Sequence, residues 1–193
     1  MKIGTKSILF GVHQFIWHPV TVARAFKWLY GRWPDRYEWC GIIFHDLGYW
    51  GKPNIDGKEG RLHPYKGAEM AGKAAIWVAL QSGHGPRFAA QIGAHIEEWT
   101  LRHSRELSKQ RNVEPSSLCW ADKACCFFDP TPLYLLRSCA SGEMYEFRVN
   151  ARGHVPDDFS YRDWYNWYRL MMWHLPQITG ALRLRHMLEK RGR

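Results

Sequence analysis

The apolar residues of this chain recur mostly at helical spacing, and prolines mark the places where the helical segments begin. Alternation with a period of two, which is typical of half-buried strands, is rare. Proline suits the first turn of a helix, where its missing N–H is not needed. The pattern therefore predicts an all-α protein, with five helices at about 19–31, 34–46, 64–81, 86–103 and 115–128.

A chain of 193 residues is long enough for one domain with its own core, and we find no linker that would divide it. We expect a single domain over residues 1–193, with a core at about 13–128. The rest, about 129–193, is predicted to be a helical C-terminal extension, within which residues 161–173 form an aromatic helix. No motif in the extension indicates a function.

Cysteine content and charge bear on location and partners. The five cysteines are odd in number and include no CxxC pair, so we expect no disulfide framework and a cytoplasmic protein. The apolar run within residues 1–17 is too short to span a bilayer, so no transmembrane segment is expected. The formal net charge of +9 favours anionic partners, either a small phosphorylated molecule or nucleic acid.

Six histidine and aspartate residues stand near the ends of the expected helices or within one that its neighbours can surround. Helices packed side by side can direct such residues into one central pocket. Imidazole and carboxylate together suit iron, manganese, cobalt or zinc. A metal ion held in this way makes its bound water acidic enough to supply hydroxide near neutral pH. The six residues are His18, His45, Asp46, His63, His103 and Asp122.

The order of these residues resembles that of the HD superfamily of metal-dependent phosphohydrolases, in which a histidine is followed by an adjacent His-Asp pair and then by an aspartate. The segment IIFHDLGYWGK is similar to the second-helix signature of that superfamily. LHPYKGAEMA resembles the additional histidine segment of its two-metal members, and His103 resembles their further histidine. The resemblance covers roughly residues 13–128 and implies an HD-domain helical bundle of five core helices.

For members with all six ligands, the resemblance implies two divalent transition-metal ions bridged by Asp46. Relatives with this ligand set include diadenosine tetraphosphate hydrolases, cyclic dinucleotide phosphodiesterases and two di-iron oxygenases. The Gly-Tyr-Pro signature of the cyclic dinucleotide enzymes is not present here. The remaining implied ligands are His18, His45 and Asp122 for one ion, and His63 and His103 for the other.

Two alternatives concern the ligand set. His95 lies on the same expected helix as His103. His103 better matches the interval to Asp122, but the long interval from His63 to His103 keeps His95 open as the fifth histidine. In a simpler one-metal site built from the first histidine, the His-Asp pair and Asp122, His63 and His103 would instead contact the substrate.

Basic residues close to the implied ligands in sequence indicate an anionic substrate. An arginine can clamp a phosphate with two hydrogen bonds, and a lysine supplies a point charge. Lys52, which follows the His-Asp pair, is placed with His45 and Asp46 among the catalytic residues. The predicted substrate-binding residues are Lys52, Arg61, Lys66, Arg105 and Lys123.

The expected function is hydrolysis of a phosphate ester or anhydride, with nucleotides as the substrate class. One alternative is a mixed-valent di-iron oxygenase, because the same six ligands hold that centre in the oxygen-using relatives. The other is a catalytically inactive module that binds nucleotide or nucleic acid through the basic, tryptophan-rich C-terminal third.

Overall fold

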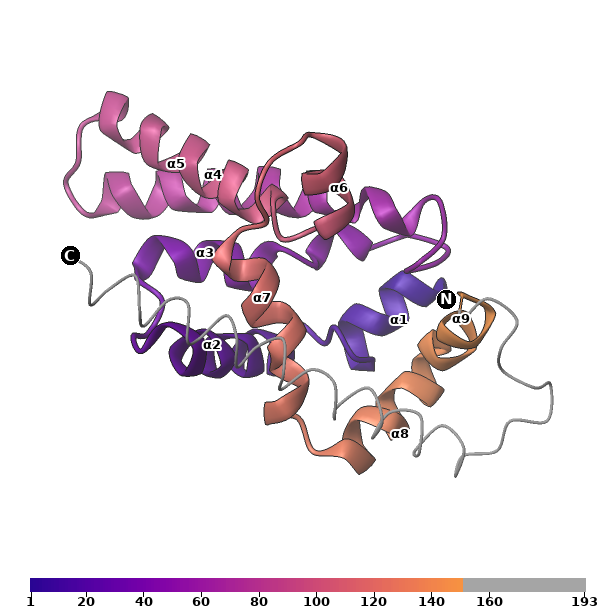
Figure 1. Cartoon of the computed structure of the whole chain (residues 1–193). Coiled ribbons are helices and arrows are strands. Elements are labelled where there is room, and N and C mark those ends of the chain that lie inside the picture. The colour runs from indigo at the N-terminus through magenta and orange to yellow at the C-terminus, as the bar shows by residue number, and fades with distance from the viewer. Residues whose placement is uncertain (151–193) are drawn as a thin grey trace.

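The computed structural model describes residues 1–150, and this part of the chain contains helices and no strands, which confirms the all-α prediction (Figure 1). Three short 3-10 turns connect the helices. The α-helices are α1 (Ile3–Phe10), α2 (Trp17–Tyr30), α3 (Arg36–Phe44), α4 (His63–Gln81), α5 (Pro86–Leu101), α6 (Arg105–Gln110), α7 (Ser117–Ala124), α8 (Thr131–Ser141) and α9 (Glu143–Asn150). The 3-10 turns are η1 (Leu47–Tyr49), η2 (Gly60–Leu62) and η3 (Cys125–Phe128).

The five expected helices correspond to α2, α3, α4, α5 and α7, with shifted ends. Pro34 does not open α3, because Asp35 caps it: its carboxylate accepts hydrogen bonds from the N–H groups of Tyr37 and Glu38. The Glu38 side chain in turn accepts a hydrogen bond from the N–H of Asp35, which completes a capping box. The last expected helix ends early at Ala124 and continues as the 3-10 turn η3.

Two described segments outside the five expected helices are also helical. The N-terminal lead-in contains α1, and the basic stretch after His103 contains α6, which begins with a Ser104 side chain accepting from the N–H of Leu107. Pro130 and Pro132 lie at the start of α8, where proline is well tolerated. Helices α8 and α9 form the described part of the extension, and the expected aromatic helix at 161–173 lies outside the described residues.

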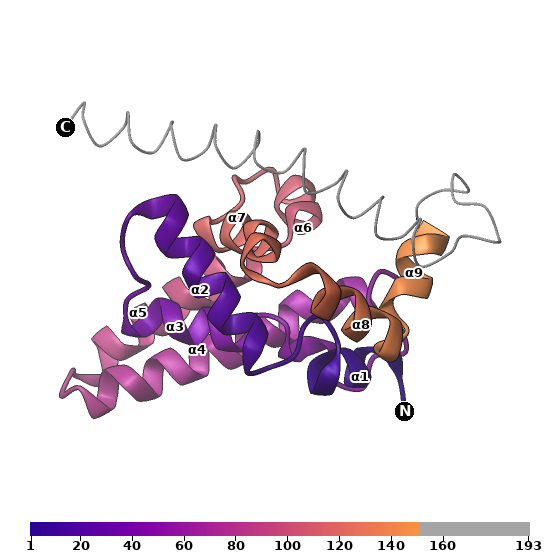
Figure 2. The same cartoon turned by 90° about the horizontal axis from the view of Figure 1, so that it is seen from below.

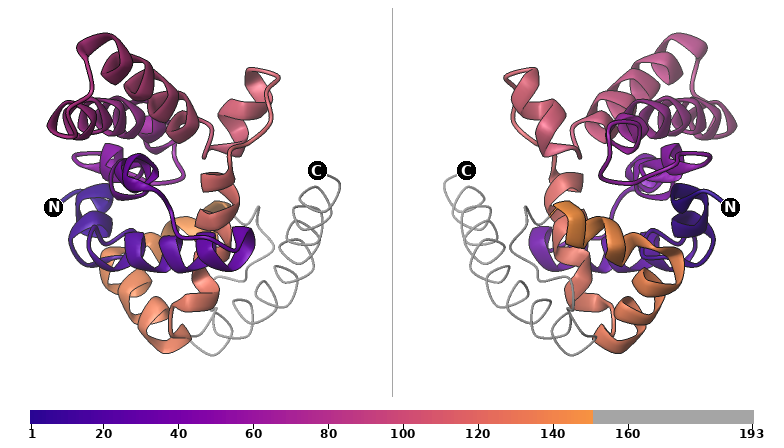
Figure 3. Two further views of the ribbon diagram at one scale, coloured as in Figure 1. Left: turned by 90° about the vertical axis from the view of Figure 1, so that its left-hand side faces the viewer. Right: turned by 90° about the vertical axis from the view of Figure 1, so that its right-hand side faces the viewer.

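The helices form two groups around the middle of the chain. Helices α4 and α5 form an antiparallel hairpin that covers α3, and α2 packs against α7 and η3. Figure 2 shows α1, α8 and α9 gathered at one end of the molecule, away from the tip of the α4–α5 hairpin. In the views of Figure 3, the hairpin and the α8–α9 pair lie on opposite sides of α3.

The core side chains are large and often aromatic on one side of α3, and many of those on the other side are small. Phe26, Leu29 and Leu118 are buried between α2, α3 and α7, with several partly buried tryptophans packed around them. On the other side, Ala71 and Ala75 let α4 lie close to α3. This close approach brings the start of α4 to the end of α3, where the His-Asp pair lies.

None of the described helices combines the length and the apolarity needed to cross a bilayer.

Candidate metal centre

Each of the six predicted ligands is positioned by a different end or turn of the helical framework. His18 lies in the first turn of α2, and Asp122 lies within α7. His45 is the residue after α3, and Asp46 precedes η1. His63 begins α4, and His103 follows the end of α5. All but Asp122, which is partly buried, are at most 8% exposed.

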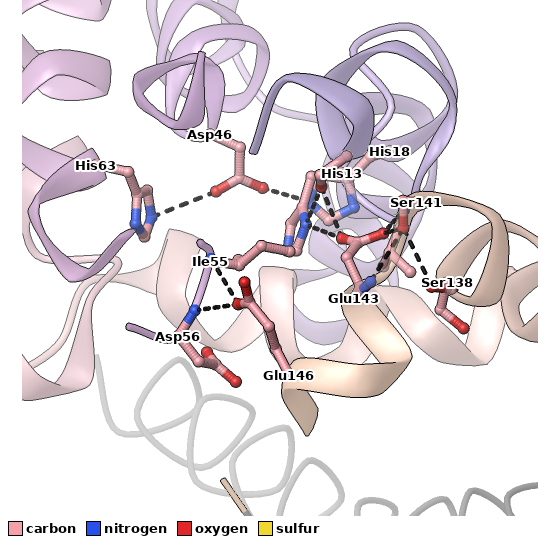
Figure 4. A network of polar contacts seen from close by, with 12 residues as sticks. His13, His18, Asp46, Ile55, Asp56, His63, Ser138, Ser141, Glu143 and Glu146 are labelled. Carbon is pink, nitrogen blue, oxygen red and sulfur yellow. Dashed lines mark hydrogen bonds and ion pairs between the residues drawn. The ribbon is translucent and has the colours of Figure 1, made fainter. Parts of the chain in front are cut away.

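These side chains converge into two groups that share Asp46. His18, His45, Asp46 and Asp122 form one group, and Asp46, His63 and His103 form the other. One oxygen of Asp46, Oδ2, lies 3.0 Å from His18 Nε2 and 3.1 Å from His45 Nε2. Its second oxygen, Oδ1, lies 3.5 Å from His63 Nε2 and 3.9 Å from His103 Nε2. Figure 4 shows this carboxylate between His63 on one side and His18 on the other.

The histidines face one another through the same ring nitrogen. His63 Nε2 lies 3.1 Å from His103 Nε2, and His18 Nε2 lies 3.2 Å from His45 Nε2. Asp122 Oδ1 lies beside the pair of His18 and His45, 3.3 Å from His18 Nε2. All these atoms are ones that bind metal ions.

Backbone carbonyls fix the ring tautomer of three of these histidines. His45 Nδ1 donates to the carbonyl of Ile42 at 2.9 Å, in the last turn of α3, where carbonyls lack a helical partner. His103 Nδ1 donates in the same way to Thr100 at 2.6 Å, and His63 Nδ1 donates to Gly60 at 2.8 Å. In the neutral ring the other nitrogen, Nε2, then carries a lone pair. This is the arrangement that metal-binding histidines use.

The facing Nε2 atoms of His63 and His103 each carry a lone pair, and neither carries a hydrogen that could form a hydrogen bond between them. Burial holds the pKa of His63 well below its usual value, and His103 lowers it further. Burial likewise lowers the pKa of His103 to about 4, so both rings are neutral near pH 7. Two such nitrogens 3.1 Å apart repel each other unless a cation lies at the point where they converge.

The group around His45 attracts positive charge for a different reason. Burial disfavours a charged His45, but the carboxylates of Asp46 and Asp122 outweigh it and raise its pKa to about 9. Asp46 Oδ2 is a buried oxygen without a hydrogen-bond partner in the described part of the chain. An orphaned carboxylate oxygen surrounded by imidazole nitrogens fits a metal ion, so both groups can hold one.

A cavity of about 390 Å³ opens in front of this centre. Asp46, His63, His103 and Asp122 line its inner side. Three basic residues on its rim are exposed: Arg61, Arg105 and Lys123. Lys123 also lies 3.1 Å from Asp122 Oδ2.

The structure does not bring all the predicted substrate-binding residues together. Lys52 and Lys66 do not line this cavity. The carbonyl of Lys52 accepts a hydrogen bond from the N–H of Gly4, which ties it to α1. Lys66 pairs with Glu69 on the exposed face of α4. Of the five predicted residues, only Arg61, Arg105 and Lys123 line this cavity, where they can contact a molecule bound in front of Asp46.

The structure also separates His95 from His103. His95 is exposed on α5, whereas His103 is buried beside His63. We expect His103→Ala to reduce the bound metal by about one equivalent, because only the second group loses a ligand. The exposed residue provides the control: His95→Ala is expected to leave the metal content unchanged, as measured by plasma mass spectrometry. Metal loss in the His95 variant would contradict this assignment.

Several residues that surround the centre were not predicted from the sequence. Tyr49 stacks on His63, with ring centroids 3.7 Å apart. The thiol of Cys125 lies 3.7 Å from His18 Nδ1. From α9, Glu143 binds His13, and Glu146 accepts from the N–H groups of residues 55 and 56 (Figure 4). The described start of the C-terminal extension thus holds two parts of the cavity wall.

Glu143 gives the protein a pH-dependent contribution to stability. Burial opposes its ionisation, but hydrogen bonds and charge from His13 and bonds from Ser141 and Ser7 lower its pKa below the usual 4.5. Its stabilising effect is therefore present above pH 4.5 and is lost as the pH falls through the lowered value. We expect Glu143→Gln to reduce the free energy of unfolding by about 2 kcal/mol at pH 6.

Urea unfolding of the metal-free protein at pH 6, 5 and 4 measures this contribution. His13 is the titratable group that faces Glu143, and its own pKa is raised above 6.5, so it stays protonated in the folded protein over this range. The difference between wild type and variant should shrink toward pH 4. A difference that stays constant would show that the carboxylate charge is not what stabilises the fold.

Comparison of the chain with known protein families, with curated proteins and with solved structures finds no match.

Proposed function

We propose that this protein is a metal-dependent phosphohydrolase with an HD-type centre, which cleaves a phosphate ester or anhydride, with nucleotides as the expected substrates. The observation that carries the proposal is the pair of facing histidine couples that share Asp46 at the base of a cavity with a basic rim. The resemblance of the segments around His45 and His63 to the two-metal HD members supports the same assignment.

Each of the two groups of side chains would hold one ion. His18, His45 and Asp122 would bind the first ion and His63 and His103 the second, with one oxygen of Asp46 directed to each. The ligand set suits iron, manganese, cobalt or zinc. When bound, such ions supply Lewis-acid chemistry, which activates water and neutralises charge on a phosphoryl group.

The rim residues of the chain would bind and orient the anion. Arg61 and Arg105 can each donate two parallel hydrogen bonds to a phosphate. Lys123, beside Asp122, adds a positive charge close to the centre, and Asp122 raises its pKa so that it remains charged. The catalytic role predicted for Lys52 has no counterpart at this cavity, and the proposal does not include it.

A substrate screen tests the proposal. Protein loaded separately with manganese, iron, cobalt or zinc is assayed for release of phosphate, nucleotide or nucleoside from nucleotides, dinucleoside polyphosphates and bis(p-nitrophenyl) phosphate. We expect hydrolysis that disappears with EDTA and a raised KM in Arg105→Ala. Arg87→Ala is the control, because Arg87 is exposed on α5 and does not line the cavity.

Two outcomes would favour other functions. Oxygen consumption with a polyol or phosphonate, together with a mixed-valent di-iron signal in electron paramagnetic resonance, would identify an oxygenase. Salt-sensitive binding of nucleic acid that survives His45→Ala, without turnover of any substrate, would identify a binding module. Either result in the absence of phosphate release overturns the proposed hydrolysis.

A further inference from the structure

A buried carboxylate and a histidine lie beside the metal centre without belonging to either group of ligands. Glu143, at the start of α9, is fully buried. His13, just after α1, lines the central cavity together with Asp46 and Tyr49. The two residues lie 130 positions apart in the sequence, and His13 Nδ1 is 2.8 Å from Glu143 Oε1. Figure 4 shows the His13 ring near Asp46, with Glu143 next to it and joined to it by a dashed line.

Glu143 is surrounded by hydrogen-bond donors. The Ser7 hydroxyl donates to Oε1 at 2.6 Å, and the N–H of Val12 donates to Oε2 at 2.8 Å. The Ser141 hydroxyl also binds Oε2. An ionised carboxylate only accepts hydrogen bonds, and this many donors stabilise its charge despite burial.

This environment selects one tautomer of His13. Because the Glu143 carboxylate can only accept, Nδ1 of His13 must carry the hydrogen of the bond between them. The Ser7 hydroxyl, 2.8 Å from Nδ1, is committed as a donor to Glu143 and cannot donate to the ring as well. In the neutral ring, which forms above the raised pKa of His13, the second nitrogen, Nε2, is then left with its lone pair, as in the carboxylate–histidine pairs of hydrolases.

The Nε2 atom of His13 has no hydrogen-bond partner within residues 1–150, and the ring is fixed in place on three sides. The ring packs at a tilt against Tyr49, with ring centroids 5.1 Å apart, and edge-to-face with His18, with centroids 5.5 Å apart. Its Nδ1 side is held by Glu143 and Ser7. A ring fixed this firmly, with 17% of its side chain exposed where the cavity opens, is placed to contact a bound molecule.

We propose that His13 is a further catalytic residue of this site, whose Nε2 accepts a hydrogen bond from water or from a hydroxyl group of the substrate, and that Glu143 is its positioning residue. The proposal deepens the phosphohydrolase assignment and rests on it for the identity of the substrate. The proposal also gives a purpose to the contacts between α9 and the N-terminal segment, because Glu143 of α9 is the carboxylate that orients the His13 ring.

The first test reads the tautomer directly and needs no turnover. Nuclear magnetic resonance of the zinc-loaded full chain, with ¹⁵N-labelled histidine and at a pH above the raised pKa of His13, reports which nitrogen of the neutral ring carries hydrogen. His13→Gln identifies the signals of His13. We expect hydrogen on Nδ1 in the wild type, and loss of this preference in Glu143→Gln. The matched control is Glu146→Gln, on the same helix, which contacts the backbone at residues 55 and 56 instead and should preserve the tautomer.

The second test asks whether His13 contacts what binds in the cavity. Inorganic phosphate is titrated into the zinc-loaded protein, and we expect the Nε2 signal of His13 to shift. A neutral wild-type ring with its hydrogen on Nε2, or an Nε2 signal that phosphate leaves unchanged, overturns the proposal. Both results are obtained whether or not the protein hydrolyses any ester, so they are distinguishable from failure of the proposed function.

Kinetics provide the third test. With bis(p-nitrophenyl) phosphate, His13→Gln is expected to lower kcat about 100-fold while metal content stays at the wild-type level. Glu143→Gln should lower kcat as well, and the double variant should be no slower than His13→Gln, because Glu143 acts through His13. Additive losses, or loss of metal in His13→Gln, would show a merely structural role.

Discussion

Replacing Asp46 with asparagine is expected to remove metal from both groups at once. Asp46 is the one residue common to the two ligand groups found among residues 1–150, and it directs one carboxylate oxygen to each. An amide keeps the size of the side chain but loses the negative charge that offsets a divalent cation. We expect two equivalents of transition metal in the anaerobically purified wild type and less than half an equivalent in Asp46→Asn.

Thermal unfolding should change together with metal content. A ligand present at about 1,000 times its Kd stabilises a folded protein by about 4 kcal/mol. For a chain of this length that corresponds to a rise in Tm of about 10 °C. EDTA should therefore lower the Tm of the wild type by that amount and leave Asp46→Asn unchanged, because the variant has no metal to lose.

The matched control for Asp46 is a second carboxylate in the same cavity. Asp56 lines the cavity but belongs to neither ligand group, so Asp56→Asn should keep both equivalents. One equivalent in the wild type would support the simpler centre of His18, His45, Asp46 and Asp122. Retention of one equivalent in Asp46→Asn would show that the second ion does not depend on the shared carboxylate.

The elements that the sequence predicted well are those whose signals are local. Proline at 86 marks the start of α5, and the helical spacing of apolar residues identifies the five central helices. The His-Asp pair and His63 are also recognisable from the residues next to them. The structure then brings the six predicted ligands into two groups. Buried charged groups need such partners, because a buried charge without one is costly.

The elements that could not be predicted depend on contacts between distant segments. Glu143 lies in an unremarkable stretch of sequence, and only the packing of α8 against α1 shows that it meets His13. Lys52 follows the His-Asp pair closely, but the turn at residues 47–49 leads it away toward α1. Closeness in sequence therefore suggested a role for Lys52 and gave no sign of Glu143. The place of each side chain in the structure is set by contacts with distant segments and not by its neighbours along the chain.

Close backbone approaches at two glycines hold the centre together. A Cβ atom on Gly67 of α4 would lie 2.1 Å from the carbonyl oxygen of His45. A Cβ atom on Gly48 would lie 2.0 Å from the carbonyl oxygen of His63. The obstacle is backbone in both cases, so a neighbouring side chain cannot simply move aside. These two contacts fix the distance between the His-Asp pair and the start of α4.

Gly67→Ala is accordingly expected to be destabilising, although alanine is the better helix former. The gain in helix propensity is about 1 kcal/mol, and overpacking against a fixed neighbour costs typically up to about 3 kcal/mol and more where backbone must shift. We expect a net loss of about 2 kcal/mol in the free energy of unfolding by urea, together with reduced metal content, because the end of α3 must move. Gly85→Ala is the control, since no atom lies within 4 Å of its added Cβ and its φ of −67° suits alanine. If Gly67→Ala were as stable and as metal-rich as the control, α4 would not pack on the His45 carbonyl, and the convergence of His63 with Asp46 would need another explanation.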